Sequence, residues 1–167
     1  EFVYGYDNDI LESKIGEMLL KEKWTIGTAE SCTGGYLSHL ISSVSGSSAY
    51  YKGSIVSYAN EIKQHLLKVN YDTLENVGAV SEQTVLQMLD GALQQLNVDV
   101  AIAISGIAGP TGGTEEKPVG TVFIGVGTKD KKVVRHFVFT NNRERNIQLS
   151  AIFGLEMLRK FLLKQSK

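Results

Sequence analysis

Apolar residues recur three or four positions apart in five segments of the chain, which is the period of one face of an α-helix. These segments are 9–22, 36–41, 60–67, 81–97 and 143–164. The segment 81–97 has the most regular spacing. Ser81 and Asn60 stand at the starts of two segments, where a side-chain oxygen can cap a helix. The pattern therefore predicts five helices.

A second set of segments has the composition of β-strands, with short apolar or β-branched runs bounded by Gly, Ser, Asn or charged residues. These runs are 24–29, 54–59, 98–105, 119–127 and 133–139. The run 98–105 does not alternate, as expected for a strand that helices cover on both faces. Only a short polar segment separates the last two runs, which predicts an antiparallel hairpin. The order of elements predicts an α/β protein, a three-layer α/β/α sandwich with a mixed, mostly parallel sheet.

Length and charge favour one ordinary globular domain. The chain has 167 residues, and 17 Lys and Arg nearly balance 18 Asp and Glu, so no basic excess indicates nucleic-acid binding. The apolar runs are shorter than the roughly 20 residues of a membrane span, and no signal-peptide layout precedes them. We expect a cytoplasmic protein with no membrane partner. We take 1–167 as one domain and expect residues 1–8 to be a linker from a longer protein, because the chain starts without Met.

Cysteine and histidine are too sparse to support redox or metal chemistry. Cys32 is the single cysteine, so the chain cannot form an internal disulfide. The three histidines stand far apart, with no spacing typical of a metal site. We expect neither a metal nor a cofactor.

Two residues are candidates for nucleophilic chemistry. Ser31 lies in ESCTGG, where a short strand turns into a helix, and free N–H groups at such a turn stabilise negative charge. The alternative is that Ser31 or Thr33 only caps the helix. Lys63, on the first turn of the next helix, can act as a base if burial lowers its pKa from about 10.4 to about 7–8. Otherwise it is a solvated charge.

Glycines concentrate in SGIAGPTGGTEEKPVG, directly after the apolar strand 98–105. The carboxyl end of such a strand is where open α/β sheets bind ligands, and glycine-rich turns let N–H groups converge on a phosphate. The candidate cradle consists of Gly106, Gly109, Gly112 and Gly113. The spacing matches neither a P-loop nor a dinucleotide fingerprint, so a mobile surface loop is the alternative.

Four motifs, in this order, resemble the CinA C-terminal domain family. They are TAESCTGG at 28–35, KGSIVSYANEIK at 52–63, GAVSEQTV at 78–85 and SGIAGPTGGTEEKPVGTV at 105–122. Members include nicotinamide-nucleotide amidohydrolases, so the resemblance implies hydrolysis of nicotinamide mononucleotide to nicotinate mononucleotide and ammonia, by a Ser–Lys mechanism without metal. It also implies a homodimer and, in longer proteins, a fused N-terminal nucleotide-processing domain.

The resemblance assigns roles to individual residues. Ser31 matches the family nucleophile, Lys63 its base and Tyr58 the tyrosine of YxNxxK. Ser105 matches the hydroxyl residue that opens the glycine-rich loop, often threonine in relatives, and Arg143 matches the arginine before the last helix. Tyr58 and Ser105 are expected to position protons, and Arg143 to meet the phosphate. We expect further substrate or phosphate contacts from the two glycine-containing turns: Thr33, Gly34, Gly35, Gly106, Gly109, Gly112 and Gly113.

Two departures from the family pattern bear on phosphate affinity and substrate choice. The chain has NNR at 141–143 where many members have GDR, and Ile147 where a second arginine is common. An alternative function is therefore a non-catalytic nucleotide-binding or regulatory domain of a larger CinA-type protein. Cys32 is an alternative nucleophile, because it adjoins the same helix start, where thiol pKa values fall.

Overall fold

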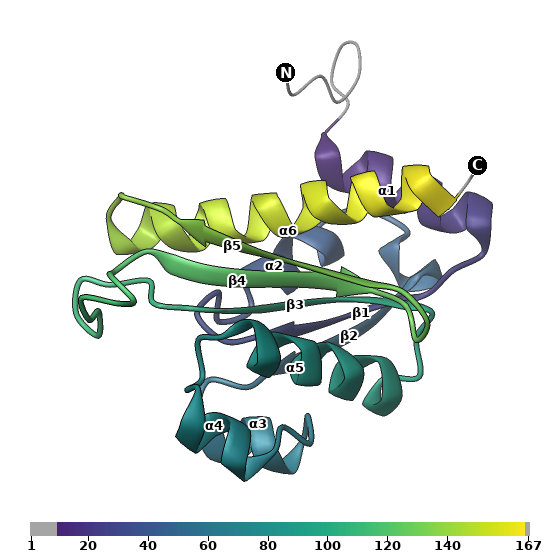
Figure 1. Cartoon of the computed structure of the whole chain (residues 1–167). Helices are drawn as coiled ribbons and strands as arrows, with labels where there is room; N and C mark the ends of the chain where they lie inside the picture. The colour runs from purple at the N-terminus through teal and green to yellow at the C-terminus, as the bar shows by residue number, and fades with distance from the viewer. Residues whose placement is uncertain (1–9, 166–167) are drawn as a thin grey trace.

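Five strands form one mixed sheet at the centre of the molecule, and the computed structural model describes residues 10–165 (Figure 1). The strands are β1 (Ile26–Glu30), β2 (Tyr51–Val56), β3 (Val100–Gly106), β4 (Thr121–Gly127) and β5 (Lys132–Val138). Their order is β2-β1-β3-β4-β5. β1 pairs in parallel with β2 and β3, whereas β4 pairs antiparallel with β3 and β5. Only β4 opposes the other strands, which confirms a mixed, mostly parallel sheet with an antiparallel hairpin.

Helices cover both faces of the sheet. They are α1 (Leu11–Glu22), α2 (Tyr36–Ser42), α3 (Asn60–His65), α4 (Tyr71–Asn76), α5 (Glu82–Gln95), α6 (Arg143–Gln165) and the short 3₁₀ helix η1 (Ser47–Ala49). α6 lies on β3 and β4, and α1 and α2 contact α6 on the same side. α5 crosses the opposite face, and α4 packs beside it. This arrangement confirms the predicted three layers. Within residues 10–165, no helix has the length and apolar character needed to cross a membrane.

The central strand β3 is buried on both faces, as its unbroken apolar run predicts. Ile102 and Ile104 belong to the apolar cluster beneath α6, and Ala101 and Ala103 belong to the cluster beneath α5. Gly154 lets α6 approach closely, because a Cβ there would lie 3.3 Å from Ile102 and 3.2 Å from Ile104. The sheet is therefore a rigid support for the turns at its edges.

Several boundaries differ from the prediction. β2 begins at Tyr51 and ends at Val56, earlier than the predicted run 54–59, and α4 was not predicted. Ser81 does cap α5, accepting from the Thr84 amide at 3.2 Å. Asn60 does not cap α3: it is the first helical residue, and the capping position is Ala59. The predicted linker 1–8 and the first residue of the predicted helix 9–22 lie outside the described residues.

Candidate active site

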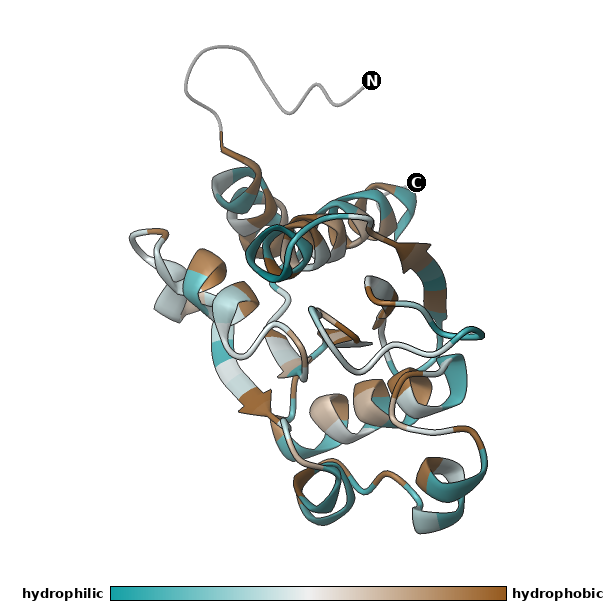
Figure 2. Cartoon of the chain, turned by 90° about the vertical axis from the view of Figure 1, so that its left-hand side faces the viewer, coloured by the Kyte–Doolittle hydropathy of each residue, from teal (hydrophilic) through white to brown (hydrophobic). Residues whose placement is uncertain are grey.

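The carboxyl ends of β1, β2 and β3 lie together at one end of the sheet, next to the starts of α5 and α6 (Figures 1 and 2). A pocket of about 250 Å³ lies at these strand ends. Seven of the twelve predicted site residues line it: Ser31, Tyr58, Lys63, Ser105, Gly106, Gly109 and Arg143. The other five, which are Thr33, Gly34, Gly35, Gly112 and Gly113, do not.

Lys63 is buried, with 1% of its surface exposed, and it reaches Ser31 from the first turn of α3. Its Nζ lies 3.0 Å from Ser31 Oγ, 2.7 Å from the Ser57 carbonyl oxygen and 3.4 Å from that of Tyr58. No carboxylate in the described part of the chain lies within ion-pair distance of this amine. Burial therefore lowers the pKa of Lys63 to about 8. The alternative of a solvated surface charge is wrong.

The Lys63 Nζ has three hydrogen-bond neighbours: it donates to Ser31 Oγ and to the carbonyl oxygens of Ser57 and Tyr58. An uncharged amine has two hydrogens and one lone pair, so after losing a proton it can still donate to the two carbonyls and accept from the Ser31 hydroxyl. With its pKa near 8, about a tenth of Lys63 is uncharged at pH 7, far more than for a lysine with an ordinary pKa. The pair can thus move the serine proton to the amine, which is the first step of nucleophilic catalysis by serine.

Glu30, the last residue of β1, organises the turn that carries Ser31. It is fully buried. Its carboxylate accepts from the backbone amides of Gly35, Leu37 and Ser38 at 3.0, 3.1 and 2.9 Å. Three hydroxyls complete the set, those of Thr33, Ser54 and Thr28, at 2.7, 3.1 and 3.4 Å. Glu30 therefore fixes the start of α2 and the end of β1 together.

Glu30 also bears on two expectations for this turn. The TGG segment was expected to contact the substrate or its phosphate; in the structure the Gly35 amide donates to Glu30 at 3.0 Å and the Gly34 amide donates to the Ser31 carbonyl oxygen at 3.1 Å. Ser31 and Thr33 do not cap the helix: the capping position is Gly35, and the Thr33 hydroxyl donates to Glu30. Gly34 and Gly35 instead supply the positive φ angles, 55° and 101°, that the tight turn requires.

Cys32 is an unfavourable nucleophile in this environment. It is 7% exposed. Burial raises the pKa of the thiol to about 12, and the negative charge of Glu30 adds to this effect against the opposing charges of Lys63 and Arg143. The expectation of a lowered thiol pKa at a helix start is wrong here, because burial raises the pKa and the nearby Glu30 carboxylate raises it further. At neutral pH the side chain remains a thiol rather than the reactive thiolate.

Arg143, the first residue of α6, bridges two sides of the pocket. Its guanidinium donates to the Gly109 carbonyl at 2.8 Å and to the Tyr58 hydroxyl at 2.9 Å. It has no carboxylate partner among the described residues, and three of its five N–H groups remain available for an anion. Tyr58 is 62% exposed, and only its backbone carbonyl contacts Lys63. Its hydroxyl therefore orients Arg143 rather than the amine.

The glycine-rich loop is held by polar side chains that connect it to its neighbours. The Ser105 hydroxyl is buried and donates to the Ala79 carbonyl at 2.7 Å, joining β3 to the segment before α5. The fully buried Asn146 side chain on α6 donates to the Ala108 carbonyl at 3.0 Å. Gly109 has φ of 89°, and a side chain there would collide with Val119. Residues 105–109 are therefore a supported wall of the pocket, whereas residues 110–116 of the same loop are exposed.

Sequence reasoning missed several residues of this region. Glu30 and Asn146 hold the turns in place, and Asn60 lines the pocket. The sequence did indicate Glu30, because a carboxylate at the end of an apolar strand needs hydrogen-bond partners when it is buried. Asn146, a polar residue at a position that the helix period places toward the core, was a similar signal. The described residues contain no group of three or more His, Cys, Asp or Glu side chains able to hold a metal ion.

The fold and site define an α/β/α protein with a buried serine–lysine pair in a pocket at the carboxyl ends of its parallel strands. The chain belongs to the CinA C-terminal domain family, whose model matches residues 8–162. It is 48% identical to a CinA-like protein of Cytophaga hutchinsonii, over 97% of this chain and 39% of that protein. A CinA-like protein of Thermotoga maritima is 43% identical, over 97% of this chain and 40% of that protein.

Solved structures support the same assignment. The competence/damage inducible protein CihA of Agrobacterium tumefaciens superimposes with a TM-score of 0.88 at 34% identity, covering 96% of this chain and 98% of that one. A CinA superfamily protein of Klebsiella pneumoniae gives 0.89 at 33% identity, covering 92% and 96%. The chain spans about two fifths of the length of the two CinA-like relatives. A fused N-terminal domain and a homodimer stay predictions.

Proposed function

We propose that this domain is a Ser–Lys amidohydrolase that converts nicotinamide mononucleotide to nicotinate mononucleotide and ammonia. The observation that carries the proposal is the buried Lys63 amine, 3.0 Å from Ser31 Oγ and without a carboxylate partner in residues 10–165. If Lys63 were only a surface charge or a structural residue, nothing would require its amine to lose its hydration. The choice of substrate rests on membership of the CinA C-terminal domain family.

In the first step, Lys63 takes the Ser31 proton while Ser31 Oγ attacks the carboxamide carbon. The resulting tetrahedral oxyanion needs hydrogen-bond donors. The Cys32 amide is a candidate, because Cys32 lines the pocket and directly follows Ser31 in the chain.

Protonated Lys63 then returns its proton to the leaving nitrogen, which departs as ammonia, and an acyl ester remains on Ser31. Water, deprotonated by Lys63, attacks this ester, and the ester bond breaks to give the carboxylate and restore the Ser31 hydroxyl.

The pocket dimensions suggest how the nucleotide lies. A volume of about 250 Å³ is smaller than the ~300–1,000 Å³ of sites that enclose a drug-sized ligand. The nicotinamide end therefore enters the pocket, and the phosphate stays at its mouth. Arg143 is exposed there and has donors to spare. In this proposed orientation the reacting amide lies beside Ser31 and the charged end beside the guanidinium.

The departures from the family pattern leave Arg143 in place. Ile147 packs against the apolar cluster beneath α6 and does not line the pocket. Asn141 contributes its backbone carbonyl to the Asn146 side chain. Phosphate binding in this chain thus depends on Arg143 without the second arginine. We expect binding of the phosphate to be weaker than in relatives that have both.

The test is ammonia release from nicotinamide mononucleotide by the purified chain, with the nucleotide product identified by chromatography. We expect turnover by the unmodified protein and by Ser43→Ala, which alters an exposed serine at the end of α2. We expect none by Ser31→Ala. Saturable binding of the nucleotide without any ammonia release would contradict the proposal and favour the non-catalytic regulatory domain.

A further inference from the structure

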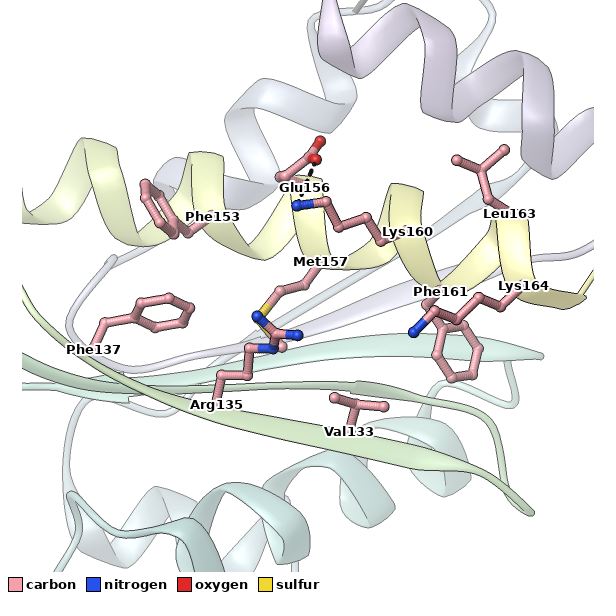
Figure 3. Close-up of a pocket in the computed structure, with 10 residues that line it drawn as sticks. All are labelled: Val133, Arg135, Phe137, Phe153, Glu156, Met157, Lys160, Phe161, Leu163 and Lys164. Carbon is pink, nitrogen blue, oxygen red and sulfur yellow. Dashed lines mark ion pairs between the residues drawn. The ribbon is translucent and has the colours of Figure 1, made fainter. Parts of the chain in front are cut away.

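A second pocket, of about 510 Å³, lies between the edge strand β5 and the C-terminal half of α6 (Figure 3). It shares no lining residue with the pocket that contains Ser31. Its volume falls in the ~300–1,000 Å³ range of small-molecule sites. The inference below is independent of the proposed amidohydrolase activity, because it concerns this separate pocket.

One wall of this pocket comes from alternate residues of β5. Side chains alternate between the faces of a strand, so Val133, Arg135 and Phe137 share the face beneath α6. The intervening Val134 and His136 face the other way: Val134 joins the cluster beneath α5, and His136 stacks on Phe123 with ring centroids 4.5 Å apart. From Val133 to Phe137 the strand covers roughly 13 Å.

The opposite wall is an apolar stripe on α6. Phe153, Met157 and Phe161 are spaced four residues apart and therefore lie on one face of the helix. Figure 3 shows Met157 between Phe153 and Phe161, above the strand. The pocket is thus an elongated apolar trough. A flexible methionine at its centre suits a flexible aliphatic occupant.

The charges around the trough are predominantly positive. Arg135 and Lys164 extend into the space between strand and helix (Figure 3), and neither has a carboxylate within ion-pair distance in the described part of the chain. The one acidic lining residue, Glu156, is already bound by Arg159 at 2.7 and 2.9 Å and by Lys160 at 3.2 Å. An anionic group is therefore the complement that the trough lacks.

From this geometry we infer that the β5–α6 pocket binds an amphipathic alkyl carboxylate. The alkyl chain lies along the stripe of Phe153, Met157 and Phe161, and burying it removes apolar surface from water. The carboxylate meets Arg135 and Lys164 at the open side of the trough. The positive charge disfavours a cationic amphiphile of the same length.

The test is calorimetric titration of the whole chain with decanoate, kept below its micelle-forming concentration. We expect saturable binding of one decanoate per chain. Acetate, which lacks the tail, and decyltrimethylammonium, which reverses the charge, are expected to bind at least about tenfold more weakly. Absence of decanoate binding at about 1 mM, or equal binding of the cationic amphiphile, would overturn the inference.

Two pairs of variants locate the site. Arg135→Gln combined with Lys164→Gln is expected to weaken decanoate binding at least about tenfold, because both cations are lost. Lys52→Gln combined with Lys131→Gln removes the same charge from exposed positions outside the trough and is expected to leave binding unchanged. Equal weakening in both double variants would show nonspecific attraction and overturn the site.

A second comparison uses two exposed valines of the same strand, whose substitution does not disturb the core. Val133→Glu puts a carboxylate into the trough, and Val138→Glu puts one outside it; the two side chains are 41% and 47% exposed. We expect Val133→Glu to abolish measurable binding and Val138→Glu to retain it. Retained binding in Val133→Glu would overturn the site.

Discussion

Two buried ionisable side chains flank the turn that carries Ser31, and their surroundings differ in kind. Glu30 is surrounded by six hydrogen-bond donors, three of them backbone amides at the start of α2. Lys63 contacts two carbonyls and one hydroxyl, and none of these is charged. The fold therefore surrounds the first residue with hydrogen-bond donors, whereas burial penalises the charge of the second.

This difference separates structural from chemical roles. A carboxylate that accepts several N–H bonds at a helix start stabilises that start. A lysine without a counter-charge is expensive to keep protonated, so it becomes a base near neutral pH. The two groups act on the same turn: one holds it in place, and the other contacts its serine. Such a division is typical of active sites, where local stability is lost in return for reactivity.

The largest expected effect is on activity. Lys63→Met and Ser31→Ala are each expected to lower the rate of ammonia release by at least about 10³-fold, because each removes one member of the pair. Lys52→Met, at an exposed position on β2, is the matched control and is expected to keep full activity. Substantial turnover by Lys63→Met would remove the base from the mechanism.

The next largest effect is on stability and concerns Glu30. Glu30→Ala leaves buried amides without an acceptor, and we expect the free energy of unfolding to fall by about 3–5 kcal/mol. Glu61→Ala, on the exposed side of α3, is expected to change it by less than about 0.5 kcal/mol. Denaturant titration measures both. A loss for Glu30→Ala as small as that of the control would mean that the helix start does not depend on this carboxylate.

In contrast to Glu30→Ala, Lys63→Met is expected to raise the free energy of unfolding. Burial lowers the Lys63 pKa from 10.5 to about 8, so below pH 8 the folded protein bears the full desolvation penalty. Between about pH 8 and 10.5 the unfolded chain holds a proton that the folded chain has released, and wild-type stability rises with pH. We expect the variant to be more stable by about 1–3 kcal/mol at pH 7, with an advantage that shrinks through this window. Denaturant titrations at pH 7 and pH 10 test the sign, and a destabilised variant at pH 7 contradicts it.

The smallest effect is expected for Cys32→Ala. Because its thiol has a pKa of about 12, loss of the sulfur should change the rate of ammonia release by no more than about threefold. Parallel assays of Ser31→Ala and Cys32→Ala distinguish the two nucleophiles. The reverse pattern, with activity kept in the serine variant and lost in the cysteine variant, would reassign the nucleophile.

The layers of the fold could be predicted because burial leaves a periodic record in the sequence. The helix spacing in 81–97 and the continuous apolar run of 98–105 each correspond to one element of the structure, α5 and β3. Short elements have too few residues to show a clear hydrophobic period. The six-residue helix α4 was missed, since only Thr73 and Leu74 are buried there and no period can be established.

The site was less predictable, because its geometry depends on tertiary contacts. Nothing in the spacing of residues 60–67 distinguishes Lys63 from a surface lysine; its burial arises from packing of α3 against the turns after β1 and β2. The family resemblance, rather than the residue pattern, singled it out. The Glu30 carboxylate went unrecognised for a related reason, because its amide partners are assembled by the positive φ angles at Gly34 and Gly35.

The central claim is that Lys63 is an amine with a lowered pKa held against Ser31. The most direct measurement is a titration of the lysine side-chain carbons by NMR in ¹³C-labelled protein, with Lys63→Met to assign the signal. We predict that the Lys63 side chain titrates near pH 8. A Lys63 signal that titrates near the ordinary lysine value of about 10.4 would contradict the account.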